Sequence, residues 1–173
     1  MDEIDKYIKQ SNQLIIEIND STDLVDPITK LYENLFIIQG RTTAFADILS
    51  KLGITHVVSI GRTPHQAVIM GPFLKFELQG LMDTPQENLS IHFPTIFAFI
   101  RKAIKDGGKI ACGCEMGCSR SVTVMIAFLR ANGYFGSLQE TYDYVKSKRP
   151  WIMPNNGFQE QLRKFFSEKL ICY

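Results

Sequence analysis

The chain has 173 residues, a length that suits a single domain. Hydrophobic residues make up 45% and charged residues 21%, which predicts an ordered chain with a sizeable core. The formal net charge is only +1, whereas proteins that bind nucleic acid or a membrane surface usually carry a clear positive excess. We therefore expect no nucleic acid and no membrane as partners.

The N-terminus and the cysteines predict where the protein resides. No apolar run approaches the roughly 20 residues of a membrane span, and the acidic start at residues 1–6 lacks the basic beginning of a signal peptide. Cys112, Cys114 and Cys118 crowd within seven residues, unlike the spread cysteines of a secreted disulfide framework. We expect a cytoplasmic protein with reduced thiols, the nucleus being the alternative.

Residues 1–27 predict an N-terminal extension made of a helix and a polar, turn-rich connector, because Ile4, Tyr7 and Ile8 have helical spacing. From residue 28 onward short apolar strands alternate with amphipathic helices, and the first two strands form a hairpin. The expected strands are 28–32, 35–38, 54–60, 73–78 and 110–112, and the expected helices are 42–52, 91–106, 122–129, 138–147 and 155–170.

This alternation indicates a three-layer α/β domain with a mostly parallel central sheet of about five strands flanked by helices. In such sheets ligands bind beyond the carboxyl ends of the strands. The loop that follows strand 110–112 lies there, and we expect the loops that hold Asp83 and residues 62–65 to border the same crevice.

The loop from Cys114 to Arg120 joins that buried strand to an almost wholly apolar helix. Its backbone N–H groups can turn inward and the helix adds its positive N-terminal end, so the loop can trap an anion. A cysteine at the bottom of such a trap loses its proton easily, and an arginine at its rim can fork onto two phosphate oxygens. Gly117 permits the curl of the loop. The arrangement predicts a cysteine-dependent phosphatase.

Hydrolysis of a phosphate monoester needs a nucleophile, for which Cys114 is the candidate, and a carboxylic acid on another loop to protonate the leaving alcohol. Asp83 is the candidate acid and Glu87 the runner-up. The Ser121 hydroxyl is placed to help expel the thiolate in the second step. No metal and no other cofactor is required. The expected substrate-binding residues, through their amides and one guanidinium, are Glu115, Met116, Gly117, Cys118, Ser119 and Arg120.

The segment Cys114-Glu-Met-Gly-Cys-Ser-Arg120-Ser121 resembles the Cys-x5-Arg-Ser/Thr signature of protein tyrosine phosphatases, and among them the small dual-specificity phosphatases. The resemblance covers about residues 28–166. It implies a phosphotyrosine protein phosphatase-like catalytic domain over 28–173, acting through a phosphocysteine on phosphotyrosine and phosphoserine or phosphothreonine in proteins. The implied roles are Cys114 as nucleophile, Arg120 as phosphate clamp, Asp83 as acid and base, Ser121 as aid to the second step and Asn155 as support of the phosphate loop.

One position departs from the family pattern, because Gly113 stands where the family usually has a histidine that orders the loop and keeps the cysteine ionised. We expect weaker catalysis or a shifted pH optimum. The alternative is a low-activity or pseudophosphatase-type module that binds phosphoproteins. A metal site at Cys112, Cys114 and Cys118 also stays open, although their spacing is not that of a zinc pair. The sequence leaves the oligomeric state open.

Overall fold

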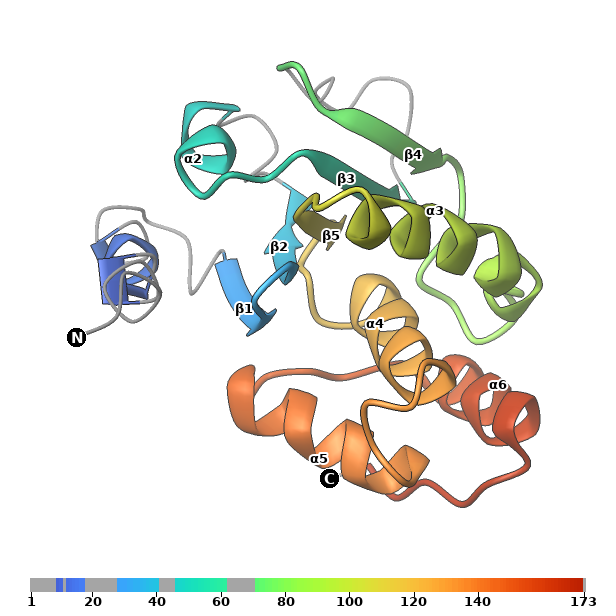
Figure 1. The fold of residues 1–173 in the computed structure, drawn as a ribbon. Helices are drawn as coiled ribbons and strands as arrows, with labels where there is room; N and C mark the ends of the chain where they lie inside the picture. The colour runs from blue at the N-terminus through green and yellow to red at the C-terminus, as the bar shows by residue number, and fades with distance from the viewer. Residues whose placement is uncertain (1–8, 11, 18–27, 41–45, 62–70, 173) are drawn as a thin grey trace.

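The structure, a computed structural model, describes residues 9–10, 12–17, 28–40, 46–61 and 71–172. The expected connector 19–27, the start of the expected helix 42–52 and the loop 62–65 lie outside the described residues. A five-stranded sheet of order β1-β2-β5-β3-β4 forms the centre (Figure 1). Its strands are β1 (Ile28–Tyr32), β2 (Leu35–Gln39), β3 (His56–Ile60), β4 (Leu74–Leu78) and β5 (Ile110–Cys114).

The pairing of the strands confirms the expected mostly parallel sheet. β1 and β2 form the predicted antiparallel hairpin, while β2, β5, β3 and β4 run parallel. β5 is two residues longer than expected, so it ends at Cys114 itself. The candidate nucleophile therefore lies at the carboxyl end of the central strand, where parallel sheets bind their ligands.

Helices cover both faces of the sheet and complete the expected three layers. Within the described residues the labelled helices are α2 (Ala46–Lys51), α3 (Phe93–Lys105), α4 (Arg120–Ala131), α5 (Leu138–Lys148) and α6 (Asn156–Phe166). Helices α3, α4 and α5 contact the sheet on one side, where α6 packs against α4 and α5, and α2 lies on the other side of the sheet (Figure 1).

Capping chemistry places the helix starts. Pro94 lies in the first turn of α3, where its missing N–H costs no hydrogen bond. Ser137 and Glu140 form a capping box at the start of α5, and Asn155 caps α6. Glu87, the runner-up acid, lies in the loop before α3, because the chain becomes helical only at Ser90, in a short 3-10 turn.

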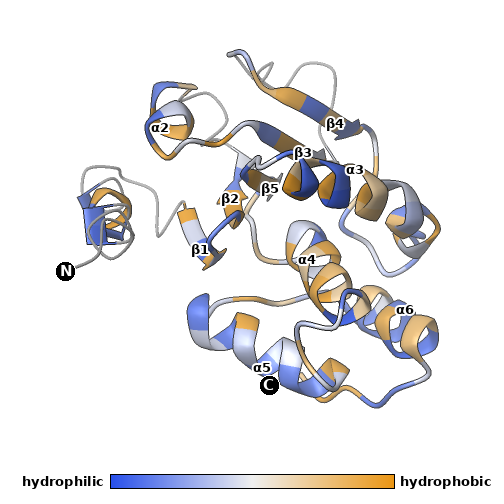
Figure 2. Ribbon diagram, in the orientation of Figure 1, coloured by the Kyte–Doolittle hydropathy of each residue, from blue (hydrophilic) through white to orange (hydrophobic). Residues whose placement is uncertain are grey.

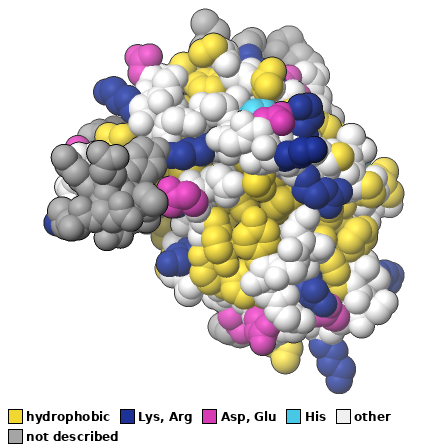
Figure 3. Space-filling model, viewed as in Figure 1, with side chains coloured by type: hydrophobic (Ala, Val, Ile, Leu, Met, Phe, Trp, Pro, Cys, Tyr) yellow, Lys and Arg dark blue, Asp and Glu magenta, His cyan; other side chains and the backbone are white. Residues whose placement is uncertain are grey.

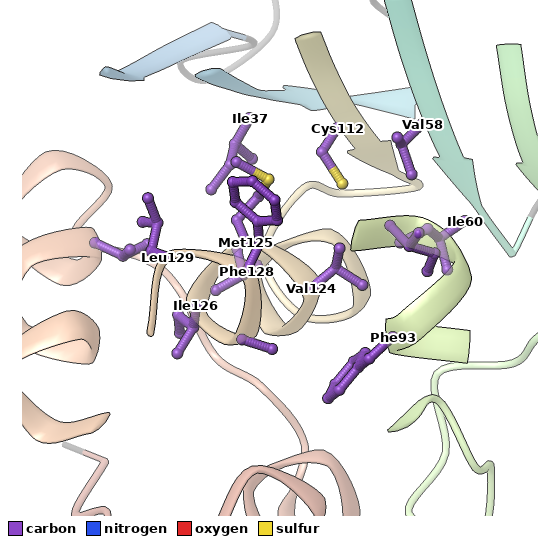
Figure 4. Close-up of a cluster of buried hydrophobic side chains, with 14 of the residues drawn as sticks. Ile37, Val58, Ile60, Phe93, Cys112, Val124, Met125, Ile126, Phe128 and Leu129 are labelled. Atoms are coloured by element: carbon purple, nitrogen blue, oxygen red, sulfur yellow. The ribbon is translucent and has the colours of Figure 1, made fainter. Parts of the chain in front are cut away.

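The main core lies between the sheet and helices α3 to α6, and α4 runs through it (Figure 4). Every residue of α4 from Arg120 to Leu129 is buried. Hydrophilic residues alternate with hydrophobic ones on α3, α5 and α6, whereas α4 is mostly hydrophobic (Figure 2). A helix that is apolar nearly all round must be buried, so the first turn of α4 is held in place by neighbours on every side.

A second, smaller cluster covers the opposite face of the sheet. It contains Phe36, Ile38 and Ala111, together with residues from α2. Residues 9–10 and 12–17 are helical, and Leu14 and Ile15 pack against this cluster. The division into an extension at 1–27 and a domain at 28–173 stays a prediction, but this part of the extension shares apolar contacts with the sheet.

On the face seen in Figure 3, positively charged and hydrophobic side chains gather in different areas. Lysine and arginine side chains gather over α3, and hydrophobic side chains gather near the centre of this face (Figure 3). Among the described helices, none combines the length and the apolar character that crossing a membrane requires.

Candidate active site

The candidate nucleophile lies at the base of a short loop between β5 and α4. Cys114 is 1% exposed. Its Sγ lies 3.2 Å from Oγ of Ser121, in the first turn of α4. Ser119 is the N-cap residue of α4, so the Ser121 side chain is not used for capping and faces the thiol instead.

All five carbonyl oxygens of residues 115–119 accept hydrogen bonds from outside the loop. The carbonyl of Glu115 accepts from the amide of Gly40 at 3.0 Å. The carbonyls of Met116 and Gly117 accept from the guanidinium of Arg149 at 3.4 and 2.7 Å, and that of Cys118 accepts from the amide of Met153 at 2.8 Å. The carbonyl of Ser119 accepts from both the amide and the hydroxyl of Thr123. In a trans peptide the N–H points opposite to the C=O, so the amides of residues 116–120 turn away from these partners, as an anion site requires.

Gly117 is essential to the shape of the loop. Its φ is +65°, in the left-handed region that favours glycine. A Cβ there would lie 2.8 Å from the carbonyl oxygen of Ile38 and 2.9 Å from Nη2 of Arg149. Glycine therefore allows both the turn and the close approach of these two neighbours.

The guanidinium of Arg120 is oriented before any ligand binds. Nη1 donates to the carbonyl oxygens of Gly61 at 3.3 Å and Leu81 at 3.0 Å. The opposite edge is less engaged: Nε lies 3.6 Å from Oδ2 of Asp83, and Nη2 lies 3.6 Å from Oε2 of Glu115. Nε is buried and has no hydrogen-bond partner among the described residues. Because a buried donor without a partner is costly, this edge suits an oxyanion.

Asp83 lies on a separate loop, and the structure brings it to the phosphate loop. Its Oδ1 accepts a hydrogen bond from the hydroxyl of Ser119 and another from the side-chain amide of Asn155, each at 2.8 Å. The backbone amide of Asn155 also donates to Oγ of Ser119 at 3.3 Å. Oδ2 faces Nε of Arg120 at 3.6 Å and accepts no hydrogen bond from the described residues, so it is the less engaged oxygen of the carboxylate. 

Residues farther along the same loop are fixed by one side chain of α6. Oε1 of Gln161 accepts from the amides of Leu89 at 2.8 Å and Ser90 at 3.0 Å, and its Nε2 donates to the carbonyl of Glu87 at 2.7 Å. The Glu87 side chain lines a separate cavity between this loop and α6. The structure thus brings Asp83, rather than Glu87, to Arg120.

The remaining sequence-predicted residues lie around the loop in different environments. The side chains of Glu115 and Met116 are exposed at its rim, at 66% and 60%. Cys118 is half-buried, and burial together with the neighbouring Cys114 raises its thiol pKa. Cys112 is fully buried, which raises its pKa well above the usual range. No three His, Cys, Asp or Glu side chains among the described residues are arranged to hold a metal ion.

Gly113, where the family usually has a histidine, lies close against the side chain of a neighbouring strand. It lies in β5 beside Ile38 of β2 and Ser59 of β3. A Cβ at Gly113 would lie 2.9 Å from Cγ1 of Ile38, whose side chain is fully buried. The Ile38 side chain would have to shift to admit a larger residue at position 113. In this chain the loop is held by other contacts, from Gly40, Arg149 and Met153.

Sequence reasoning missed three features of this site. Arg149 is not among the candidate residues, yet it bonds the loop carbonyls of Gly117 and Met116 from 32 and 33 residues away. Gln161 carries no chemical signal in the sequence, since amide side chains on helices are common. The direct bonds from Ser119 and Asn155 to Asp83 were not expected either, although both residues were singled out.

The family model described as "Dual specificity phosphatase, catalytic domain" matches residues 35–168. Dual specificity protein phosphatase 22-A of Danio rerio is 33% identical over 146 residues, covering 84% of this chain and 68% of that protein. Dual specificity phosphatase 28 of Mus musculus is 34% identical over 140 residues, covering 80% and 83% respectively. The MAP kinase phosphatase with leucine-rich repeats protein 3 of Dictyostelium discoideum is 37% identical over 128 residues, but this chain spans only 14% of it.

Solved structures give the same result at the level of the fold. The crystal structure of human DUSP28 matches with a TM-score of 0.72 and 31% sequence identity, over 80% of this chain and 92% of that one. The matched family model covers most of the chain, including β2, β5, the loop 114–120 and α6. The chain therefore belongs to the family of cysteine-dependent dual-specificity protein phosphatases.

Proposed function

We propose that this chain hydrolyses phosphotyrosine and phosphoserine or phosphothreonine monoesters in protein substrates, through a phosphocysteine at Cys114. The observation that carries the proposal is the loop itself: its five carbonyls are bonded from outside, and the unbonded Nε of Arg120 faces the carboxylate of Asp83. Donors fixed in advance around a developing negative charge stabilise the transition state.

In the first step the thiolate of Cys114 attacks phosphorus, and the bond to the leaving oxygen breaks. The amides of residues 116–120 and the Nε–Nη2 edge of Arg120 bind the equatorial oxygens, displacing the side chains that now face this edge. Asp83 donates its proton from Oδ2 to the departing alkoxide or phenoxide, while Ser119 and Asn155 hold Oδ1.

In the second step water attacks the phosphocysteine, and the Asp83 carboxylate takes the proton from that water. The S–P bond breaks and the thiolate of Cys114 leaves. Oγ of Ser121, 3.2 Å from Sγ, donates a hydrogen bond to the departing sulfur and so lowers the barrier to its expulsion.

The rim of the loop favours single phosphate esters in proteins. Glu115 and Met116 are exposed beside the anion site, so the rim is acidic and apolar instead of basic. An acidic rim disfavours polyanionic substrates such as phosphoinositides. All four cysteines are free thiols, which fits a reducing compartment such as the cytoplasm, with the nucleus as the alternative.

The alternative function, a phosphoprotein-binding module with little turnover, is less favoured. Its motivation is Gly113, but the loop around Cys114 has other supports, from Gly40, Arg149 and Met153. Purified protein assayed with phosphotyrosine, phosphothreonine and phosphoserine peptides distinguishes the two functions. Release of phosphate supports the enzyme, and peptide binding without release between about pH 5 and 8 supports the binding module.

Replacing Asp83 by asparagine is expected to slow hydrolysis of poor leaving groups most. Phosphoserine peptides release a basic alkoxide that needs a proton in the transition state, and general acids contribute about 10²–10⁴-fold. For para-nitrophenyl phosphate, whose leaving group is stable as an anion, the first step should slow far less. The measurement is kcat/KM for both substrates.

Glu87→Gln is the matched control, because Glu87 lies on the same loop but lines a different cavity. It should leave both substrates unaffected. Equal losses for the two substrates in Asp83→Asn, or a leaving-group effect in Glu87→Gln, would remove Asp83 from the role of acid.

A further inference from the structure

Arg149 is the most deeply buried large cation near the phosphate loop. It is 0% exposed and lies at the end of α5, just before Pro150. Burying a guanidinium is costly unless its donors are bonded. The buried guanidinium of Arg149 therefore holds the orientation of the carbonyl groups to which it donates.

The contacts of Arg149 join three parts of the fold at the base of the loop. Nε donates to the carbonyl oxygen of Gly117 at 2.7 Å, and Nη2 donates to that of Met116 at 3.4 Å. Nη1 donates to Oγ1 of Thr29 in β1 at 2.8 Å. The guanidinium carbon lies 4.8 Å from the centroid of the Trp151 ring, a cation–π contact that fixes the plane of the guanidinium.

These bonds set the direction of two amides. The C=O of Met116 shares a peptide plane with the N–H of Gly117, and the C=O of Gly117 shares one with the N–H of Cys118. Because both carbonyls point to Arg149, both N–H groups point away from it. The other loop carbonyls accept hydrogen bonds from backbone amides or from Thr123 of α4. Among these donors to the loop carbonyls, Arg149 alone carries a charge.

We propose that Arg149 is a positioning residue for the phosphate loop, which aims the amides of Gly117 and Cys118 at the phosphoryl group. It does so in a loop whose residue before the nucleophile, Gly113, offers no side chain for ordering. The positive charge of Arg149 also polarises the two peptide groups, which strengthens their N–H donors. The inference rests on the proposed function, since the bound anion is the phosphoryl group.

The positions of Gly117 and Arg149 constrain each other. A Cβ at Gly117 would lie 2.9 Å from Nη2, so a side chain there pushes the guanidinium away from its carbonyls. The loop sequence and the residue at the end of α5 therefore depend on each other, although 32 positions separate them.

The test compares Arg149→Gln and Arg149→Lys with the wild type and with Arg163→Gln. Arg163 is a matched control, because its Nε and Nη2 also bond a backbone carbonyl, that of Leu170, away from the phosphate loop. The probe is inorganic orthovanadate, which adopts the five-coordinate geometry of the transferring phosphoryl group. Calorimetry gives its affinity without any turnover, and kcat, KM for para-nitrophenyl phosphate and the melting temperature are measured beside it.

Arg149→Gln is expected to weaken orthovanadate binding by about 10- to 100-fold, the order that follows from losing hydrogen bonds to a charged group. It should lower kcat more than it raises KM, because pre-aimed amides act most strongly on the transition state. Arg149→Lys keeps the charge but lacks the fork, so its loss should be partial. Arg163→Gln should leave orthovanadate affinity unchanged.

Wild-type orthovanadate affinity in a folded Arg149→Gln protein would overturn the inference, whatever happens to the melting temperature. If Arg149→Gln does not fold, Arg149→Lys decides in the same way, since unchanged affinity in that variant also overturns it. Failure of the proposed function gives a different result: wild-type protein that binds orthovanadate but releases no phosphate from any substrate.

Discussion

Cys114→Ser is expected to abolish turnover while leaving the fold and phosphopeptide binding intact. A serine hydroxyl is a weak nucleophile unless a base removes its proton, and the group bonded to Cys114 Sγ is the hydroxyl of Ser121, which is no base. The loss in kcat should reach about 10⁴-fold or more, as when other covalent nucleophiles are removed. Initial rates with para-nitrophenyl phosphate measure it.

The matched control for this variant is Cys172→Ser. Cys172 is a half-buried free thiol that lines a different cavity, with Tyr142, Ile152 and Gln159. Its replacement should change the rate little. Turnover near the wild-type rate in Cys114→Ser would exclude a phosphocysteine at this position, and equal losses in both variants would indicate a general effect of removing thiols.

Arg120→Lys is expected to reduce kcat/KM by about 10³-fold, a loss of the size seen when a fixed donor to a developing charge is removed. A lysine ammonium cannot bond the carbonyls of Gly61 and Leu81 and still present two parallel donors to phosphate. The free edge of the guanidinium, with its unbonded Nε, is lost. Steady-state kinetics with a phosphotyrosine peptide give the value.

Arg130→Lys provides the same substitution at the other end of α4. The guanidinium of Arg130 pairs with Glu168, remote from the loop. This variant should keep wild-type kcat/KM, even if its melting temperature falls. Comparable activity in Arg120→Lys and the wild type would contradict the role of Arg120 as phosphate clamp.

The parts of the site that are local in sequence could be predicted. A buried strand, a glycine-containing loop and an apolar helix follow one another within residues 110–131, so the pattern alone placed Cys114 and Arg120 at the two ends of one loop. The alternation of strands and helices gave the three layers for a similar reason, because connections in such folds are short and neighbours in sequence pack together.

The particular hydrogen bonds between distant segments could not be predicted, although the Asp83 loop was expected near the phosphate loop. Asp83 and Asn155 are 72 positions apart, and their hydrogen bond exists only because the start of α6 packs beside the loop of Asp83. Gly157 shows how closely they approach, since a Cβ there would lie 2.1 Å from the carbonyl oxygen of Pro85. A glycine in the first turn of a helix does not indicate from the sequence which distant segment packs against it.

The structure gives a physical context for Gly113, which stands where the family usually has a histidine. From the sequence it is a missing histidine and a reason to expect weak catalysis. In the structure it is the partner of Ile38 across a parallel strand pair, whose register the sequence does not reveal. Support for the loop comes instead from Gly40, Arg149 and Met153, three segments that reach it through tertiary packing.

The measurement that tests the central claim most directly is the capture of the phosphocysteine. Ser121→Ala removes the hydroxyl beside Sγ and should slow the second step, so the intermediate accumulates when a phosphotyrosine peptide is mixed with this variant and quenched in acid. Peptide mass mapping is predicted to find one phosphoryl group on Cys114, and none in the Cys114→Ser/Ser121→Ala double variant. Substrate turnover with no phosphoryl group on Cys114 at any quench time, or with the group on another residue, would contradict the account.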